Sequence, residues 1–124
     1  MTYSMIDENR KCKDYLDCPE VLVKYVAEKL SIPFNSKIIW CGVTYYAQFI
    51  PDPLSLNHLR TNTFMYDPFS EKFNINYPSY DSRCNNLTIK EVIDKITELI
   101  KDYQQHMKQR RIDAIISAAA SFEA

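Results

Sequence analysis

The stretch Thr63-Phe-Met-Tyr-Asp-Pro-Phe-Ser-Glu-Lys-Phe-Asn-Ile-Asn-Tyr77 contains two strand-like runs separated by a turn signal. Asp67 before Pro68 is typical of the start of a type I turn, because the Asp side chain accepts a backbone hydrogen bond and Pro presets φ. In the second run apolar residues alternate with polar ones; the apolar set is Phe73, Ile75 and Tyr77. The stretch therefore predicts a hairpin in an antiparallel sheet with one buried face.

The run from Lys37 to Ile50 is also strand-like, because it is rich in β-branched and aromatic residues. It contains the single glycine of the chain, Gly42, and two interpretations fit. Gly42 forms a bulge in one long strand, or it lies in the turn of a tight hairpin. In both cases alternate residues share one face, namely Val43, Tyr45, Ala47 and Phe49. Pro51 ends the run, and the leucines before Thr61 favour a short packed helical turn.

A first helix is predicted from the segment at Asp17 to about Leu30. Pro19 suits the first turn of a helix, and the following acidic residue, Glu20, is favourable at the N-terminus. Apolar residues then recur on one helical face: Val21, Leu22, Tyr25, Val26 and Leu30. Pro33 ends the helix, because it disfavours helical geometry in the residue before it.

A second, longer helix begins at the sequence Thr88-Ile-Lys-Glu91. This is a capping box, in which the Thr hydroxyl and the Glu carboxylate each accept a hydrogen bond from a backbone N–H of the first turn. Apolar residues follow at helical spacing: Ile89, Val92, Ile93, Ile96, Leu99, Ile100, Tyr103 and Met107. After the charged segment 108–111 the spacing resumes up to Phe122. Because neither Gly nor Pro interrupts it, one continuous helix is favoured over a second helix after a bend.

These elements predict an α+β fold, with a small antiparallel sheet of three to four strands, an N-terminal helix and a long C-terminal helix in the order α-β-β-β-α. Three regions are expected. Residues 1–16 are a polar N-terminal arm that orders only by docking, residues 17–107 form a single α+β domain, and residues 108–124 are a C-terminal helical extension.

Composition excludes several classes of protein. The chain has 124 residues and a net charge of −1, so the molecule as a whole has no electrostatic attraction to nucleic acid or anionic membranes. One glycine is too few for a phosphate-binding loop, so we expect no nucleotide cofactor. No apolar run approaches the length of a membrane helix, and the first residues do not resemble a secretion signal. We therefore expect a cytoplasmic protein that binds no membrane.

The residues capable of nucleophilic or metal chemistry are scattered. The cysteines are Cys12, Cys18, Cys41 and Cys84, and the histidines are His58 and His106. Their spacing matches no zinc motif, and nothing in the sequence joins a Cys, a His and an acid into a catalytic set. We expect reduced thiols, no metal site, no cofactor and no enzymatic activity. A bridge between Cys12 and Cys18 stays possible if the arm folds back onto the first helix.

The sheet region contains more apolar residues than one buried face of a sheet can hold. On a long alternating strand Trp40 and Tyr46 fall opposite the core face, and Tyr and Trp exposed together are typical of protein interfaces. The C-terminal extension also carries an apolar stripe that reaches past any sheet. We predict six partner-binding residues: Trp40, Tyr46, Ile112, Ile115, Ile116 and Phe122.

The sequence therefore favours a small non-enzymatic protein-binding module that acts by steric occlusion. The residues of A/T-rich codons are abundant, as in many phage and mobile-element genes, which suggests an inhibitor of a host protein, including a host defence protein. The partner is a host protein or a second copy of the chain, with a homodimer formed through the C-terminal helix.

Two alternatives stay open. A nucleic-acid-binding regulator would use the basic residues Lys108, Arg110 and Arg111. Asn74–Pro78 and Leu87–Glu91 belong to a region in which a strand ending in Pro leads through a short loop to a Thr-capped amphipathic helix. This region faintly resembles HicB-type antitoxins over about a quarter of the chain, although the glycines of the loop are missing here. A virion or assembly component would instead self-associate through the C-terminal extension.

Overall fold

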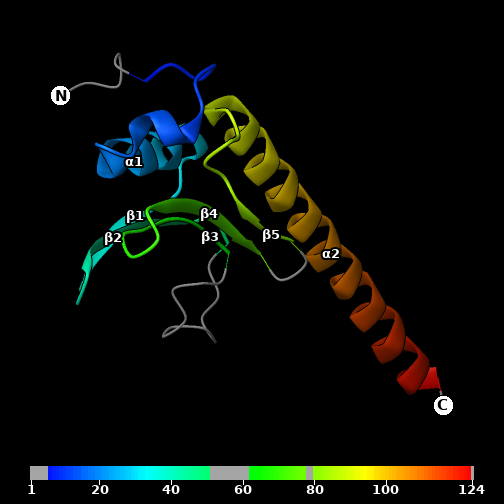
Figure 1. The fold of residues 1–124 in the computed structure, drawn as a ribbon. Coiled ribbons are helices and arrows are strands. Elements are labelled where there is room, and N and C mark those ends of the chain that lie inside the picture. The colour runs from blue at the N-terminus through cyan, green and yellow to red at the C-terminus, as the bar shows by residue number, and fades with distance from the viewer. Residues whose placement is uncertain (1–5, 51–61, 78–79, 124) are drawn as a thin grey trace.

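The computed structural model of the protein describes residues 6–50, 62–77 and 80–123 (Figure 1). Its elements, in chain order, are the 3-10 helix η2 (Cys12–Tyr15), α1 (Pro19–Leu30), β1 (Phe34–Ile39), β2 (Gly42–Gln48), β3 (Thr63–Asp67), β4 (Lys72–Tyr77), β5 (Tyr80–Arg83) and α2 (Ile89–Glu123). The short helical turn predicted after Pro51 falls outside the described residues.

The α+β class is confirmed, but the sheet has five strands in the order β1-β2-β3-β4-β5, not three to four. All neighbouring strands are antiparallel. The strand that the sequence did not predict is β5, a segment of four residues. It is too short to show an alternating pattern, and its extended geometry comes from pairing with β4, where Asn74 lies opposite Arg83.

The segment with Gly42 is a tight hairpin, so the bulge interpretation was wrong. Pairing runs without offset from Phe34 opposite Ala47 to Ile39 opposite Gly42, with only Trp40 and Cys41 in the turn. Gly42 has φ of 143°, a conformation that side chains rarely adopt. A Cβ there would lie 3.3 Å from the Cβ of Pro68 in the neighbouring hairpin. Glycine therefore allows the two hairpin turns to approach closely.

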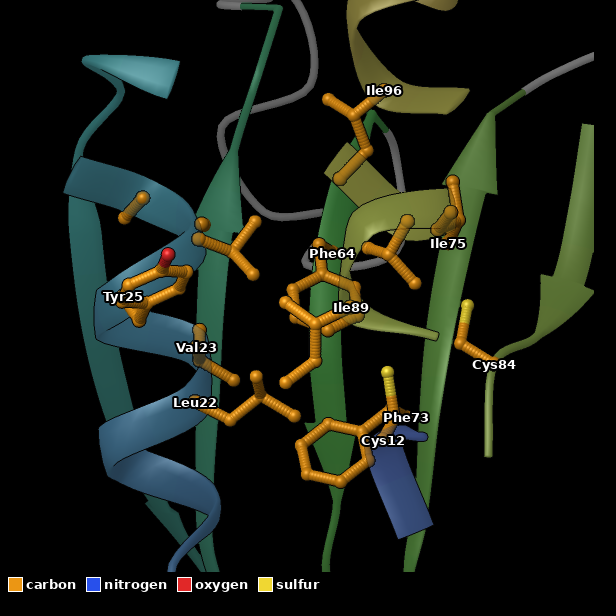
Figure 2. Packing of buried hydrophobic residues seen from close by; sticks show 14 of the residues in the cluster. Cys12, Leu22, Val23, Tyr25, Phe64, Phe73, Ile75, Cys84, Ile89 and Ile96 are labelled. Atoms are coloured by element: carbon orange, nitrogen blue, oxygen red, sulfur yellow. The ribbon is translucent and has the colours of Figure 1, made fainter. Parts of the chain in front are cut away.

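The core lies on one face of the sheet, beneath α1 and the first turns of α2 (Figures 1 and 2). The predicted alternation of β4 is confirmed, since Phe73 and Ile75 are fully buried. The rings of Phe64 and Phe73 stack with their centroids 5.9 Å apart. Both helices contribute to this cluster with Leu22, Val23, Val26, Ile89, Val92 and Ile96.

The described part of the N-terminal arm packs against the domain. Cys12 is fully buried in the core, and Tyr15 is nearly so. The arm also satisfies the start of α2, because the Ile89 N–H donates to the Arg10 carbonyl at 3.0 Å and the Lys90 N–H donates to the Glu8 carbonyl at 2.9 Å. These are backbone donors that a helix cannot satisfy by itself.

The capping box at the start of α2 is confirmed. The Thr88 N–H donates to the Glu91 carboxylate at 2.9 Å, and the Glu91 N–H donates to the Thr88 hydroxyl at 3.1 Å. The helix then runs without a break to Glu123, as the missing Gly and Pro predicted. Figure 1 shows that its second half extends beyond the sheet.

A polar cluster fastens the arm to α1. The carboxylate of Glu8 accepts a hydrogen bond from the Tyr25 hydroxyl and forms an ion pair with Lys29 at 3.3 Å. The Tyr25 hydrogen bond, together with the positive charges of Lys29 and Lys90, lowers the pKa of Glu8. Burial and the neighbouring carboxylate raise the pKa of Tyr25 to about 12.

We predict that Glu8→Gln destabilises the fold by about 1–2 kcal/mol at pH 7, the typical range for a partly exposed hydrogen bond to a charged group. Because the folded pKa of Glu8 lies below its ordinary value of 4.5, this stabilisation is complete above that value and is lost as the pH falls through the folded pKa. Urea denaturation of wild type and variant at pH 7 and pH 3 measures the effect. The difference should shrink at pH 3, and an equal difference at both pH values would contradict the prediction. Asp94→Asn, which removes an exposed carboxylate from α2, is the control.

Candidate protein interface

Cys12 and Cys84 both belong to the buried core, whereas His106, the histidine within the described residues, lies on the surface. Burial raises the pKa of the Cys12 thiol to about 12, which leaves it without nucleophilic character at neutral pH. Cys84 is also buried and donates to the Ser82 carbonyl at 3.4 Å. His106 lies on the exposed half of α2, 3.6 Å from Asp102. His58 falls outside the described residues.

No disulfide joins the four cysteines, all of which lie in described segments. Within residues 6–50, 62–77 and 80–123, no three or more His, Cys, Asp or Glu side chains gather into a group that would hold a metal ion. The side chains that stand out on the surface are instead apolar.

Four large hydrophobic side chains are exposed in the described segments: Ile38, Trp40, Phe69 and Ile112. Three of them lie at one end of the sheet, on β1 and in the turns after β1 and β3. The rings of Trp40 and Phe69 contact each other, with centroids 5.6 Å apart and planes inclined by 55°. Yet Trp40 is 86% exposed and Phe69 is 68% exposed. We call these two residues the tip patch.

Phe69 is held outward by the turn between β3 and β4. The carboxylate of Asp67 accepts the Phe69 N–H at 2.9 Å and the Ser70 hydroxyl at 2.7 Å, as the Asp-Pro signal predicted. Glu71 adopts a positive φ of 53°, and its carbonyl accepts the Asn85 side-chain amide at 3.2 Å. Hydrogen bonds on both sides therefore hold the backbone of the turn that carries Phe69.

Trp40 lies in the neighbouring turn, which joins β1 and β2. This turn has only two residues, between Ile39 and Gly42, and the Trp40 side chain there extends into solvent. The close approach of Gly42 to Pro68 joins the two turns into one surface. The indole and phenyl rings therefore form a preordered apolar patch that loses little conformational entropy when it binds.

The tip patch has the chemistry of a protein-binding hot spot. Trp is the residue most enriched at such positions, and a contacting aromatic pair offers a large apolar area on stiff side chains. Asp67 and Lys72, which lie opposite each other beneath the turn, supply one charge of each sign to the rim. The patch thus combines an apolar centre with a polar border, the anatomy typical of interfaces.

The other predicted partner-binding residues do not gather around Trp40. Tyr46 lies farther along β2 on the face away from the core, half-buried between Asn35 and Met65 on the adjacent strands. Ile112 lies on α2 and is 42% exposed. Ile115, Ile116 and Phe122 belong to the same helix, but their side chains are outside the described residues.

The basic residues also lie on α2. Lys108 and Arg110 are exposed, whereas the side chain of Arg111 is outside the described residues. Acidic side chains interrupt this surface, because Asp102 pairs with His106 and Asp113 accepts from Gln109 at 3.0 Å. The mixed charges weaken the positive field that phosphate recognition needs.

Sequence reasoning missed Phe69 and Ile38 as exposed residues. A signal was present for Phe69, because the third residue of an Asp-Pro turn cannot reach a core from the end of a hairpin. No such signal existed for Ile38, whose alternation with Lys37 reads as a buried strand position. Its 84% exposure follows from the position of α1, which packs mainly over β2 and β3.

Comparisons with protein-family models, with curated proteins and with solved structures find no match. Among the described residues, no helix has the length and apolar character needed to cross a bilayer. The function must therefore be argued from the surface of this chain.

Proposed function

We propose that this protein is a non-enzymatic protein-binding module that engages its partner through the tip patch and acts by steric occlusion. The observation that carries the proposal is the contact between Trp40 and Phe69 in two braced turns, with most of both rings in solvent. An exposed apolar patch of this kind lowers the solubility of the protein and adds little to the stability of the fold, so a binding role explains it best.

The nature of the partner rests on composition. A chain rich in the residues of A/T-rich codons suits a phage or mobile-element gene, and in that form of the proposal the partner is a host protein, including a defence protein. A nucleic-acid-binding role is less well supported, because Lys108 and Arg110 share their helix surface with Asp102 and Asp113. Self-assembly through α2 is the other role proposed from the sequence.

The test uses Trp40, the single tryptophan of the chain, as its own probe. Titration of a purified partner, found by capture from host lysate with the wild-type protein, should shift the indole fluorescence to shorter wavelength as the ring leaves water. Phe69→Ser should weaken binding by about 30-fold or more, the minimum for a hot-spot residue. Ile112→Ser, which alters the other exposed apolar site, is the matched control and should bind normally.

Two outcomes would contradict the proposal. If Phe69→Ser binds as well as wild type while Ile112→Ser does not, the interface lies on α2. If the complex forms without any change in Trp40 fluorescence, the ring stays in solvent and the tip patch is not buried.

A further inference from the structure

Within the described segments, the outer edge of β1 carries backbone groups that pair with no other strand, and the strand register shows which residues they belong to. The Phe49 N–H donates to the Asn62 carbonyl at 2.9 Å, so odd-numbered residues of β2 point their backbone groups toward β3. Even-numbered residues of β2 must then bond to β1, where Thr44 lies opposite Lys37. The backbone groups of the remaining β1 residues point away from the sheet. These residues are Phe34, Ser36 and Ile38.

Among the described residues, β1 ends the sheet, and nothing in those segments pairs with its outer edge. All four residues from Asn35 to Ile38 are exposed. Because α1 packs mainly over β2 and β3, the core side of β1 is also uncovered at Ser36 and Ile38. An open strand edge of this kind is a template for another strand.

We propose that β1 pairs with β1 of a second copy, antiparallel, across a two-fold axis at Ser36. In this register Ser36 lies opposite the partner's Ser36, and Phe34 lies opposite the partner's Ile38. Each of these residues points its backbone groups outward, so the pairing forms six hydrogen bonds and one continuous ten-stranded sheet. This inference goes beyond the proposed function, because it uses the edge of β1 and not the tip patch.

The sequence of β1 is complementary to itself in this register. On the core side, the phenyl ring of Phe34 packs against the partner's Ile38, which covers a side chain that is 84% exposed in one copy. On the other side, Lys37 lies opposite the partner's Asn35, so no like charges meet. Aromatic and β-branched residues in direct cross-strand contact stabilise a sheet.

Neighbouring registers are worse, because a two-fold axis at Asn35 or at Lys37 leaves only four of the six hydrogen bonds within β1. An axis at Lys37 would place two lysine side chains directly opposite each other, which is destabilising. A register whose two-fold axis falls between two residues would place each outward-pointing residue opposite an inward-pointing one. The backbone groups could then form no hydrogen-bonded ladder. A two-fold axis also closes the assembly at two copies, because the pairing uses the outer edge of β1 in both copies.

The dimer places the two tip patches at opposite ends of the paired strands. Trp40 lies four residues from Ser36, so the two indole rings would be about 27 Å apart along the strand direction, at 3.4 Å per residue. The tip patches stay outside the paired segment. The dimer is thus a bivalent binder, and the two sites strengthen attachment to a partner with repeated epitopes.

The first test is Ser36→Pro, with Ser36→Ala as the matched control. Proline removes an N–H that points away from the described part of the sheet and is tolerated on an edge strand, so circular dichroism should be nearly unchanged, as should the melting temperature at concentrations where both proteins are monomeric. Sedimentation equilibrium should show that wild type and Ser36→Ala are dimers and that Ser36→Pro has a dimer dissociation constant at least 100-fold higher. A monomeric wild type, or a Ser36→Pro dimer as tight as wild type, overturns the proposal.

The second test reads the register without proline. Asn35→Asp sets a carboxylate opposite the partner's Lys37 twice in each dimer and should tighten the dimer about fivefold at low salt, whereas Asn35→Lys should weaken it about as much. Equal dissociation constants for the two variants overturn the register. A chain that ends at Arg111 should still dimerise, and its loss of dimerisation would assign self-association to α2 instead.

Failure of this proposal is separable from failure of the proposed function. Phe69→Ser should lose partner binding and stay dimeric, while Ser36→Pro should keep the affinity of a single tip patch and lose only the gain from bivalency.

Discussion

Replacing Phe73 with alanine is expected to lower the free energy of unfolding by about 3–5 kcal/mol, a large part of the 5–15 kcal/mol typical of a small domain. The side chain is fully buried on the core side of β4. Its ring stacks on Phe64 and meets the ring of Tyr66 with centroids 5.2 Å apart. Alanine would leave a cavity in the core next to Cys12 of η2, which lies beside Phe73 in Figure 2. Urea denaturation at pH 7 measures the change.

The same substitution at Phe69 is the matched control. The two phenylalanines belong to one hairpin, but Phe69 is 68% exposed, so Phe69→Ala should change stability by less than about 0.5 kcal/mol. The two substitutions should therefore affect different properties. Phe73→Ala lowers the stability of the fold, whereas Phe69→Ala weakens only partner binding. Equal losses of stability would mean that Phe69 is part of the core and would remove the basis of the tip patch.

A chain that begins at Asp17 is expected to lose its cooperative fold. The missing arm contributes buried Cys12 and Tyr15, whose burial stabilises by about 2 kcal/mol each. It also contributes four backbone hydrogen bonds: Cys12 N–H to Leu87, Lys13 N–H to Asn85, Ile89 N–H to Arg10 and Lys90 N–H to Glu8. At about 1 kcal/mol net for each bond, the loss is on the order of 8 kcal/mol.

Far-UV circular dichroism and thermal melting measure this effect. The shortened chain should show reduced helix content and no sharp transition at 25 °C or above. Asp14→Ala in the full-length chain is the control, because Asp14 is exposed and its substitution should leave the melting temperature within a few degrees of wild type. A shortened chain that melts like wild type would show that residues 1–16 are a dispensable arm, as their polar composition alone suggests.

The structure of the N-terminal arm could not be predicted from local sequence patterns. Residues 6–16 have no periodicity, and their polar side chains are typical of a segment that lies in solvent. Their structure is defined by backbone groups, which bond to the start of α2 and to the segment before it. Backbone pairing between distant segments leaves no trace in side-chain spacing, so only the folded chain reveals it.

The candidate site was predictable in part. The two turns were indicated by Gly42 and by the Asp-Pro signal at residue 67, and Trp40 was expected on a surface. The contact between Trp40 and Phe69 joins residues from different hairpins, and it depends on the register between β2 and β3. That register is a long-range property, because a shift by one residue would reverse every side chain.

The sequence by itself determined the elements whose signals are local. The alternation of β4, the capping box of α2 and the unbroken length of that helix each depend on residues within a few positions of one another. Tertiary structure decided which apolar residues are covered. Phe73 is buried and Phe69 is exposed although both are aromatic residues four positions apart, because α1, η2 and the first turns of α2 cover the core side of the sheet and leave the β3–β4 turn uncovered. The hydrophobicity of a residue shows only that its burial is favourable. Whether the residue is buried depends on how the helices pack on the sheet.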